Sequence, residues 1–192
     1  RGWSRAAAEA ERGQARDNRV PTARALDGAE AMNQAPDYSA TYVTIQTDHG
    51  PTGFGLTFTI GRGNELCVAA VAALAPLVEG LLLEDVLSDL GGFWRRITGD
   101  SQLRWLGPDK GVIHLATAAV VNAIWDLCAK HLGKPVWQML AEMPAADIVA
   151  FVDLRYLSDA LDPSAARERL EDQTPGRAAR ILILLAQGVR AV

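Results

Sequence analysis

Two neighbouring segments with a two-residue apolar period constrain the fold of this chain more than any other feature. Val43 and Ile45 alternate with polar or aromatic side chains in Ala40–Thr47, and Phe, Leu or Ile alternates with Gly or Thr in Gly53–Ile60. This period is typical of β-strands. The connection between the two segments reads Asp-His-Gly-Pro-Thr, which is rich in turn-forming residues. The pattern therefore predicts an antiparallel hairpin over residues 40–60.

Helical patterns follow the hairpin directly. Asn64 stands where a helix N-cap is expected, and apolar residues recur every three or four positions in the longest segment, which ends before Gly133. We predict helices over 65–79, over 84–98 with an interruption at Gly91-Gly92, over 109–131 and over 135–141.

The pattern changes after residue 145. Ile148–Leu154 is a short apolar run that predicts a buried strand, and Asp162-Pro163 is a favourable N-cap and first-turn pair for a helix. Two further helices are predicted over 164–173 and 178–187. The order of elements indicates an α+β module that leads into the beginning of an α/β unit.

The composition excludes several classes of protein. Of 192 residues, 49% are hydrophobic and 22% are charged, and the net charge is −4, which is typical of a globular chain and gives no footprint for nucleic acid. Polar residues interrupt the longest apolar stretches, 68–78 and 115–127, so we interpret them as buried helices and expect no membrane partner. With only Cys67 and Cys128, a disulfide framework is excluded, and we expect a cytoplasmic location.

A search for catalytic motifs finds none. The three histidines lack the spacing of a zinc site, and Gly61-Arg62-Gly63 fails as a dinucleotide fingerprint because Leu66 replaces the third glycine. A turn is the expected role of that glycine pair. Cys67 and Cys128 have apolar neighbours and are expected to be core residues.

Residues 1–18 contain four arginines and three acidic residues. A transit peptide would have few acids, so we favour a disordered or loosely helical leader. Because this segment shows no alternating apolar pattern, we expect the sheet to lack an edge strand.

Several segments together resemble a known family. These are Ser101–Ala119, Asp37–Ala40, Gly55–Gly61 and Asn122–Leu127. They closely resemble the N-terminal part of the L-fuconate dehydratases, in the mandelate racemase branch of the enolase superfamily. The resemblance runs from about Arg19 to the end of the chain.

The resemblance implies an α+β capping domain, made of a hairpin and a helical bundle, followed by a modified (β/α) barrel. We expect a leader over 1–18, a capping domain over 19–145, and the first strand and helices of an incomplete barrel over 146–192. It also implies a Mg²⁺-assisted loss of water from a sugar acid, converting L-fuconate to 2-keto-3-deoxy-L-fuconate. The catalytic lysines, histidine and Mg²⁺-binding carboxylates of that superfamily lie at the ends of barrel strands.

Substrate contacts from the capping domain are also implied. The positions are Gly28, Ala29, Glu30 and Tyr38, with Glu30 in place of the family's usual aspartate; the alternative is that Asp27–Pro36 is an ordinary polar loop. Only 42 residues follow residue 150, so we expect a truncated chain without catalytic residues, which binds no Mg²⁺ and is inactive alone. The alternative is a non-catalytic fragment or interaction module from an interrupted gene. A homo-oligomer is compatible with the resemblance.

Overall fold

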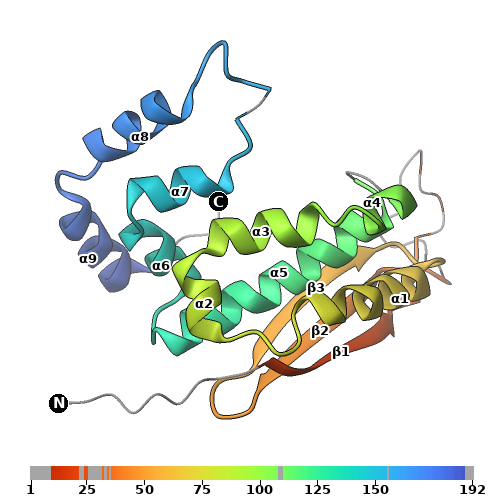
Figure 1. Ribbon diagram of the computed structural model, residues 1–192. Coiled ribbons are helices and arrows are strands. Elements are labelled where there is room, and N and C mark those ends of the chain that lie inside the picture. Colours follow the sequence, from red (N-terminus) through yellow and green to blue (C-terminus); the bar gives the residue numbers. More distant parts are fainter. Residues whose placement is uncertain are drawn as a thin grey trace.

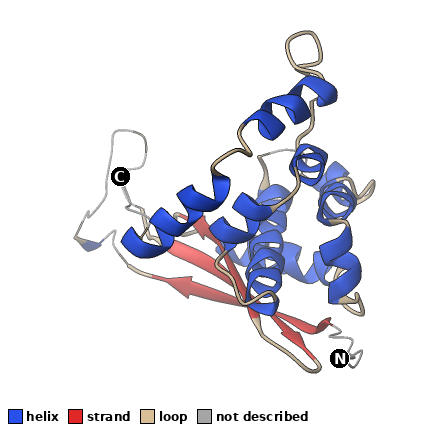
Figure 2. Ribbon diagram, turned by 90° about the vertical axis from the view of Figure 1, so that its left-hand side faces the viewer, coloured by secondary structure: helices blue, strands red, loops and turns tan. Residues whose placement is uncertain are grey.

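A three-stranded antiparallel sheet forms one layer of the protein, and helices cover one of its faces (Figures 1 and 2). The computed structural model describes residues 10–21, 24, 25, 32, 34, 36–107, 110–154 and 156–188. The strands are β1 (Ala10–Arg19), β2 (Ser39–Thr47) and β3 (Gly53–Thr59), in that order across the sheet. The pairing of β2 with β3 confirms the predicted hairpin.

Strand β1 corrects the expectation for the N-terminal segment. The prediction of a disordered leader over 1–18 is wrong for residues 10–18, while residues 1–9 lie outside the described residues. β1 pairs with β2 from Arg12 opposite Gln46 to Arg19 opposite Ser39. The expectation that the sheet lacks an edge strand is therefore wrong. Ladder hydrogen bonds come from the backbone, so an edge strand forms from polar residues without an apolar alternation of its own.

Helix α5 (Val112–His131) lies across the inner face of the sheet, beside α1 (Asn64–Leu74). Its backbone approaches β3 so closely that a Cβ atom built on Gly55 would lie 2.0 Å from the carbonyl oxygen of Ala119. The inward positions of β3 are therefore glycine and threonine. The large side chains of this strand alternate with them and point to the other face, which leaves Phe54 and Phe58 more than half exposed.

Further helices pack on α1, on α5 or on one another and complete the core. They are η2 (Ala75–Leu77), α2 (Leu83–Ser88), α3 (Leu90–Thr98) and the short α4 (Leu103–Leu106). The predicted interruption at Gly91-Gly92 is misplaced, because the chain breaks at Asp89, whose carboxylate accepts a hydrogen bond of 2.7 Å from the Gly92 N–H. The most deeply buried apolar side chains include Val43, Ile45, Leu74, Ile97, Ile124 and Leu127.

Helix α5 is long and apolar enough to cross a membrane by length and composition, with a mean hydropathy of 1.6 over its most apolar window. More than half of that window is buried inside the protein. The core helix of a water-exposed protein passes the same test, and the packing of α5 between the sheet and the other helices accounts for its apolar composition.

The expected barrel strand over Ile148–Leu154 is wrong. Residues Ala145–Phe151 form helix α7, which follows α6 (Val136–Glu142) and packs against α3. Arg95 of α3 donates a hydrogen bond of 2.7 Å to the carbonyl oxygen of Ala150. Among the described residues no strand lies beside this segment, and a helix satisfies its own backbone hydrogen bonds where a strand without neighbours cannot.

The last two helices, α8 (Pro163–Asp172) and α9 (Arg177–Gln187), lie within two residues of the predicted bounds. The Asp162 carboxylate caps α8 by accepting hydrogen bonds from the N–H groups of Ser164 and Ala165, at 2.8 and 2.9 Å, which confirms the predicted cap. Neither helix contains a buried residue.

Candidate functional site

One end of the sheet carries the loop in which the substrate contacts are expected. β1 ends at Arg19 and β2 begins at Ser39, so the connection between them leaves and returns at this end. The Val20 N–H donates a hydrogen bond of 2.8 Å to the carbonyl oxygen of Tyr38, which ties the two ends of the loop together. Gly28, Ala29 and Glu30 belong to this loop but lie outside the described residues.

Tyr38 is the expected substrate contact that the structure describes. It lies at the base of the loop, and 37% of its surface is exposed. Its ring packs on Phe58 of β3 with 5.5 Å between the ring centroids and a tilt of 55°. The contact orients the ring without burying the whole residue, so Tyr38 combines a supported position with access to the surface.

A buried asparagine joins all three strands to the first helix at the same end. Asn64 is completely buried, and its Oδ1 accepts hydrogen bonds from the hydroxyl groups of Thr41, at 3.0 Å, and Thr59, at 2.7 Å. Its Nδ2 donates to the Asp17 carboxylate at 2.5 Å and to the Ala40 carbonyl oxygen at 3.3 Å. The predicted N-cap role is wrong: Gly63 occupies that position, and the Asn64 side chain turns inward to the sheet.

Charged side chains extend this network to the surface. Arg19 contacts the carboxylates of both Asp17, at 2.9 Å, and Glu65, at 2.6 Å. Hydrogen bonds from Arg19 and then from Asn64 lower the pKa of Asp17 below its ordinary value. The pKa of Glu65 is also lowered, first by the hydrogen bond from its own backbone N–H at the start of α1 and further by Arg19.

The lowered pKa of Asp17 predicts a pH dependence of stability. Its charged form is favoured in the folded state, so its contribution is present above the ordinary pKa of 3.8 and is lost as the pH falls through the lower folded value. We expect Asp17→Asn to flatten the fall in unfolding free energy below pH 3.8, as measured by urea unfolding across an acid series. Asp172→Asn on α8 controls for the loss of one negative charge; equal slopes for the two variants would contradict the prediction.

The turn after β3 brings the helix to this end of the sheet. Gly61 and Gly63 have φ angles of 118° and 95°, which other residues rarely adopt. This confirms the expectation that the Gly61-Arg62-Gly63 segment is a turn. The first of these glycines also lies against the loop, because a Cβ atom built on it would be 3.1 Å from the Cβ atom of Asp37.

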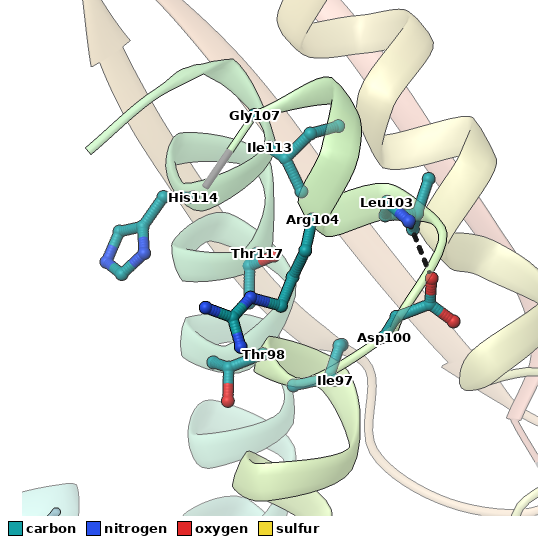
Figure 3. Close-up of a pocket in the computed structure, with 9 residues that line it drawn as sticks. All are labelled: Ile97, Thr98, Asp100, Leu103, Arg104, Gly107, Ile113, His114 and Thr117. Atoms are coloured by element: carbon teal, nitrogen blue, oxygen red, sulfur yellow. Dashed lines mark hydrogen bonds between the residues drawn. The ribbon is translucent and has the colours of Figure 1, made fainter. Parts of the chain in front are cut away.

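A surface depression lies between α3, α4 and the start of α5, and it is too small for a sugar acid. Its volume is about 20 Å³, near that of one water molecule. Figure 3 shows Arg104 reaching toward Thr98, with His114 on the opposite side of the pocket from Asp100. The Asp100 carboxylate accepts hydrogen bonds from the N–H groups of Gln102, at 3.0 Å, and Leu103, at 2.8 Å.

The described ranges contain no metal site and no reactive thiol. No group of three or more His, Cys, Asp or Glu side chains is placed to hold a metal ion there, so these residues do not fit Mg²⁺. Cys67 and Cys128 are free and buried, as expected of core residues. Burial raises the pKa of both thiols, that of Cys128 to about 12, and a protonated thiol is a weak nucleophile.

Sequence reasoning missed the network around Asn64. A signal was present, because Thr41 shares the inward face of β2 with Val43 and Ile45, and Thr57 and Thr59 hold the inward positions of β3. Polar residues at core positions indicate buried hydrogen bonds. Their common partner could not be identified from spacing alone, since it lies 23 residues from Thr41 and 47 from Asp17.

Comparison with known proteins identifies the domain. A family model described as "Mandelate racemase / muconate lactonizing enzyme, N-terminal domain" matches residues 19–141. The chain belongs to this family. The expected α+β capping domain is thereby confirmed, and its antiparallel sheet has a third strand beyond the expected hairpin.

Two curated relatives match most of the chain. L-galactonate dehydratase of Hypocrea jecorina is 49% identical over 166 residues, which are 86% of this chain and 37% of that protein. Mitochondrial enolase superfamily member 1 of Homo sapiens is 50% identical over 178 residues, 92% of this chain and 40% of the relative. The chain therefore spans about 40% of the length of these mandelate racemase family relatives.

Two solved structures are similar to this chain in fold. The crystal structure of the human Mitochondrial enolase superfamily member 1 matches with a TM-score of 0.86 and 48% identity, covering 95% of this chain and 42% of that one. A racemase from Streptomyces coelicolor A3(2) with bound magnesium matches with a TM-score of 0.59 and 24% identity, over 78% of this chain and 44% of that one. At that identity the second match shows the fold alone.

Proposed function

We propose that this chain is the capping portion of a sugar-acid dehydratase, whose loop over residues 20–38 covers the substrate. The observation that carries the proposal is the 49% identity with L-galactonate dehydratase over 166 residues. Those residues are 37% of that relative. We therefore assign to this chain only one part of the enzyme's work, which is substrate binding. In this proposal the remaining part of the enzyme supplies the groups that remove the proton and the hydroxyl group.

The loop residues suit a substrate with several hydroxyl groups. The Glu30 carboxylate would accept hydrogen bonds from sugar hydroxyls, and the Tyr38 phenol would donate or accept one. Glycine and alanine at positions 28 and 29 would allow the backbone to approach the ligand closely. A loop closed over the substrate also excludes water from the reacting carbons.

The anchored base of the loop supports this role. Its two ends are joined by the hydrogen bond from Val20 to Tyr38, and the adjoining ends of the strands are held by Asn64. A loop with fixed ends loses less conformational freedom when it orders on a ligand, so more of the contact energy appears as affinity.

Among sugar acids, the substrate that we propose is L-fuconate. L-fuconate is L-galactonate without the hydroxyl group on carbon 6, so both acids offer the same hydrogen on carbon 2 and the same leaving hydroxyl on carbon 3. Removal of water yields a 2-keto-3-deoxy acid from either. A pocket that binds the 6-hydroxyl by hydrogen bonds would reject L-fuconate by roughly 10⁴-fold, whereas an apolar pocket would discriminate only weakly.

By resemblance the complete enzyme uses Mg²⁺ to assist this reaction. The described residues of this chain do not fit the ion, so no part of the role proposed for the chain involves it. In the proposal, its ligands belong to the remaining part of the enzyme.

A chimera tests the proposal. The 166 aligned residues of this chain would replace their counterparts in the Hypocrea jecorina L-galactonate dehydratase, and both acids would be assayed for the 2-keto product. We expect activity, with kcat/KM lowered about 10- to 100-fold by Glu30→Gln and by Tyr38→Phe, since each removes a hydrogen bond to substrate.

Matched controls are Glu79→Gln and Tyr156→Phe, which make the same changes at exposed positions away from the loop. If the folded chimera shows equal kinetic constants for the loop variants and their controls, the loop does not bind substrate. A folded chimera that is inactive toward both acids would favour the alternative, a non-catalytic interaction module.

A further inference from the structure

Helix α4 carries two neighbouring apolar side chains that are largely exposed. Trp105 is 90% exposed and Leu106 is 77% exposed. The indole of Trp105 forms one wall of an open hollow of about 420 Å³, which Gly99, Ser101 and Arg104 also line. This volume lies within the roughly 300 to 1,000 Å³ that is usual for sites that bind small molecules. The hollow is therefore large enough for part of a sugar acid, unlike the smaller depression in Figure 3.

The hollow lies at the end of the sheet from which the proposed substrate loop extends. Gly53, at the start of β3, faces Ala123 of α5, whereas Gly55, further along the strand, faces Ala119. Helix α5 therefore runs antiparallel to β3 and begins near the end of that strand. Because α4 directly precedes α5, it lies at the same end, where β1 stops and β2 starts (Figure 1).

The walls of the hollow combine apolar and polar groups. The indole of Trp105 offers a flat apolar surface, and the Arg104 guanidinium offers N–H donors in a fixed plane. The Ser101 hydroxyl can donate or accept a hydrogen bond. Such a mixture suits a ligand that has both an apolar carbon and hydroxyl groups, and carbon 6 of L-fuconate is a methyl group.

We propose that Trp105 contacts carbon 6 of the sugar acid and thereby favours L-fuconate over L-galactonate; this inference rests on the proposed function. A methyl group that packs on the indole leaves water without losing a hydrogen bond. The 6-hydroxyl group of L-galactonate would lose hydrogen bonds to water that the face of an indole does not replace. Arg104 and Ser101 bind the neighbouring hydroxyl groups that the two acids share.

The backbone of α4 is held in place around Trp105. The Arg104 N–H donates a hydrogen bond of 3.1 Å to the carbonyl oxygen of Asp100, and the Gly107 N–H donates one of 3.3 Å to that of Leu103. The Asp100 carboxylate also fixes the start of the helix through the Leu103 N–H. An indole on a backbone that is already ordered loses less conformational freedom when the ligand binds, so more of its contact energy appears as affinity.

The test uses the chimera with the Hypocrea jecorina enzyme and compares kcat/KM for L-fuconate with kcat/KM for L-galactonate. We expect Trp105→Ala to lower the ratio of the first to the second by about 10-fold, since one carbon in an apolar pocket changes kcat/KM by about that much or more. Trp105→Phe should keep most of the ratio. The matched control is Leu106→Ala, which removes an exposed apolar side chain of the same helix outside the hollow and should leave the ratio unchanged.

Circular dichroism checks that each variant stays folded. An equal loss of kcat/KM for both acids in Trp105→Ala would overturn the proposal, because the indole would then support the protein and not carbon 6. A ratio no different from that of Leu106→Ala would overturn it as well. If Glu30→Gln still lowers kcat/KM in either case, the proposed function stands without this contact, whereas a chimera inactive toward both acids overturns both.

Discussion

Replacing Asn64 with leucine is expected to lower the free energy of unfolding by roughly 3 to 5 kcal/mol. The leucine would fill a similar volume but would leave the hydroxyl groups of Thr41 and Thr59 and the Asp17 carboxylate without their shared partner. Each polar group that loses its hydrogen bond where water cannot replace it costs about 1 to 3 kcal/mol. Urea unfolding followed by circular dichroism measures the loss.

Asn122→Leu is the matched control, because it makes the same substitution at an exposed position of α5. It should stay within about 0.5 kcal/mol of the parent. If the two variants lose similar stability, the buried hydrogen bonds of Asn64 do not contribute as the structure indicates.

Gly55→Ala is expected to cost at least about 3 kcal/mol, and Gly55→Val more, since overpacking against backbone leaves no side chain that can move aside. The added Cβ atom would lie 2.0 Å from the carbonyl oxygen of Ala119 and 2.6 Å from the backbone nitrogen of Ala123. Helix α5 would have to move away from the sheet, which would open the core between them. Thermal and urea unfolding both measure the effect.

Two further variants separate this overlap from other effects of losing a glycine. Gly133→Ala adds a Cβ atom that meets nothing within 4 Å, at a φ of 65°, so it should cost only the 1 to 2 kcal/mol of a left-handed residue. Ala119→Gly combined with Gly55→Ala should not restore stability, because the overlap is with backbone. A rescue, or a loss no greater than that of Gly133→Ala, would show that α5 lies farther from β3.

The Asn64→Leu and Gly55→Ala substitutions act at different places in the same domain. Gly55 sets how closely the sheet and α5 approach, and Asn64 holds the end of the sheet from which the proposed substrate loop extends. In the chimera described above, loosening at Asn64 should therefore raise KM more than an equal loss of stability elsewhere, since it frees the base of the loop.

Local chemistry determined several elements from the sequence alone. The alternation and turn residues of 40–60 specified the hairpin, and the Asp162-Pro163 pair specified the start of α8. The turn at Gly61-Arg62-Gly63 follows from the sequence in the same way. Each of these features depends on residues within a few positions of one another, so spacing is sufficient to predict it. The family and its capping domain were likewise evident from contiguous segments.

Contacts between distant segments decided the rest. β1 has no apolar alternation, and it is a strand because β2 offers a free edge to its backbone. Ile148–Leu154 has the composition of a buried strand, but without neighbouring strands its first residues close their hydrogen bonds within a helix. Gly53 and Gly55 turn the large side chains of β3 outward because α5 occupies the inner face. In each case a partner far along the chain sets the outcome, and local propensity is too weak to oppose it.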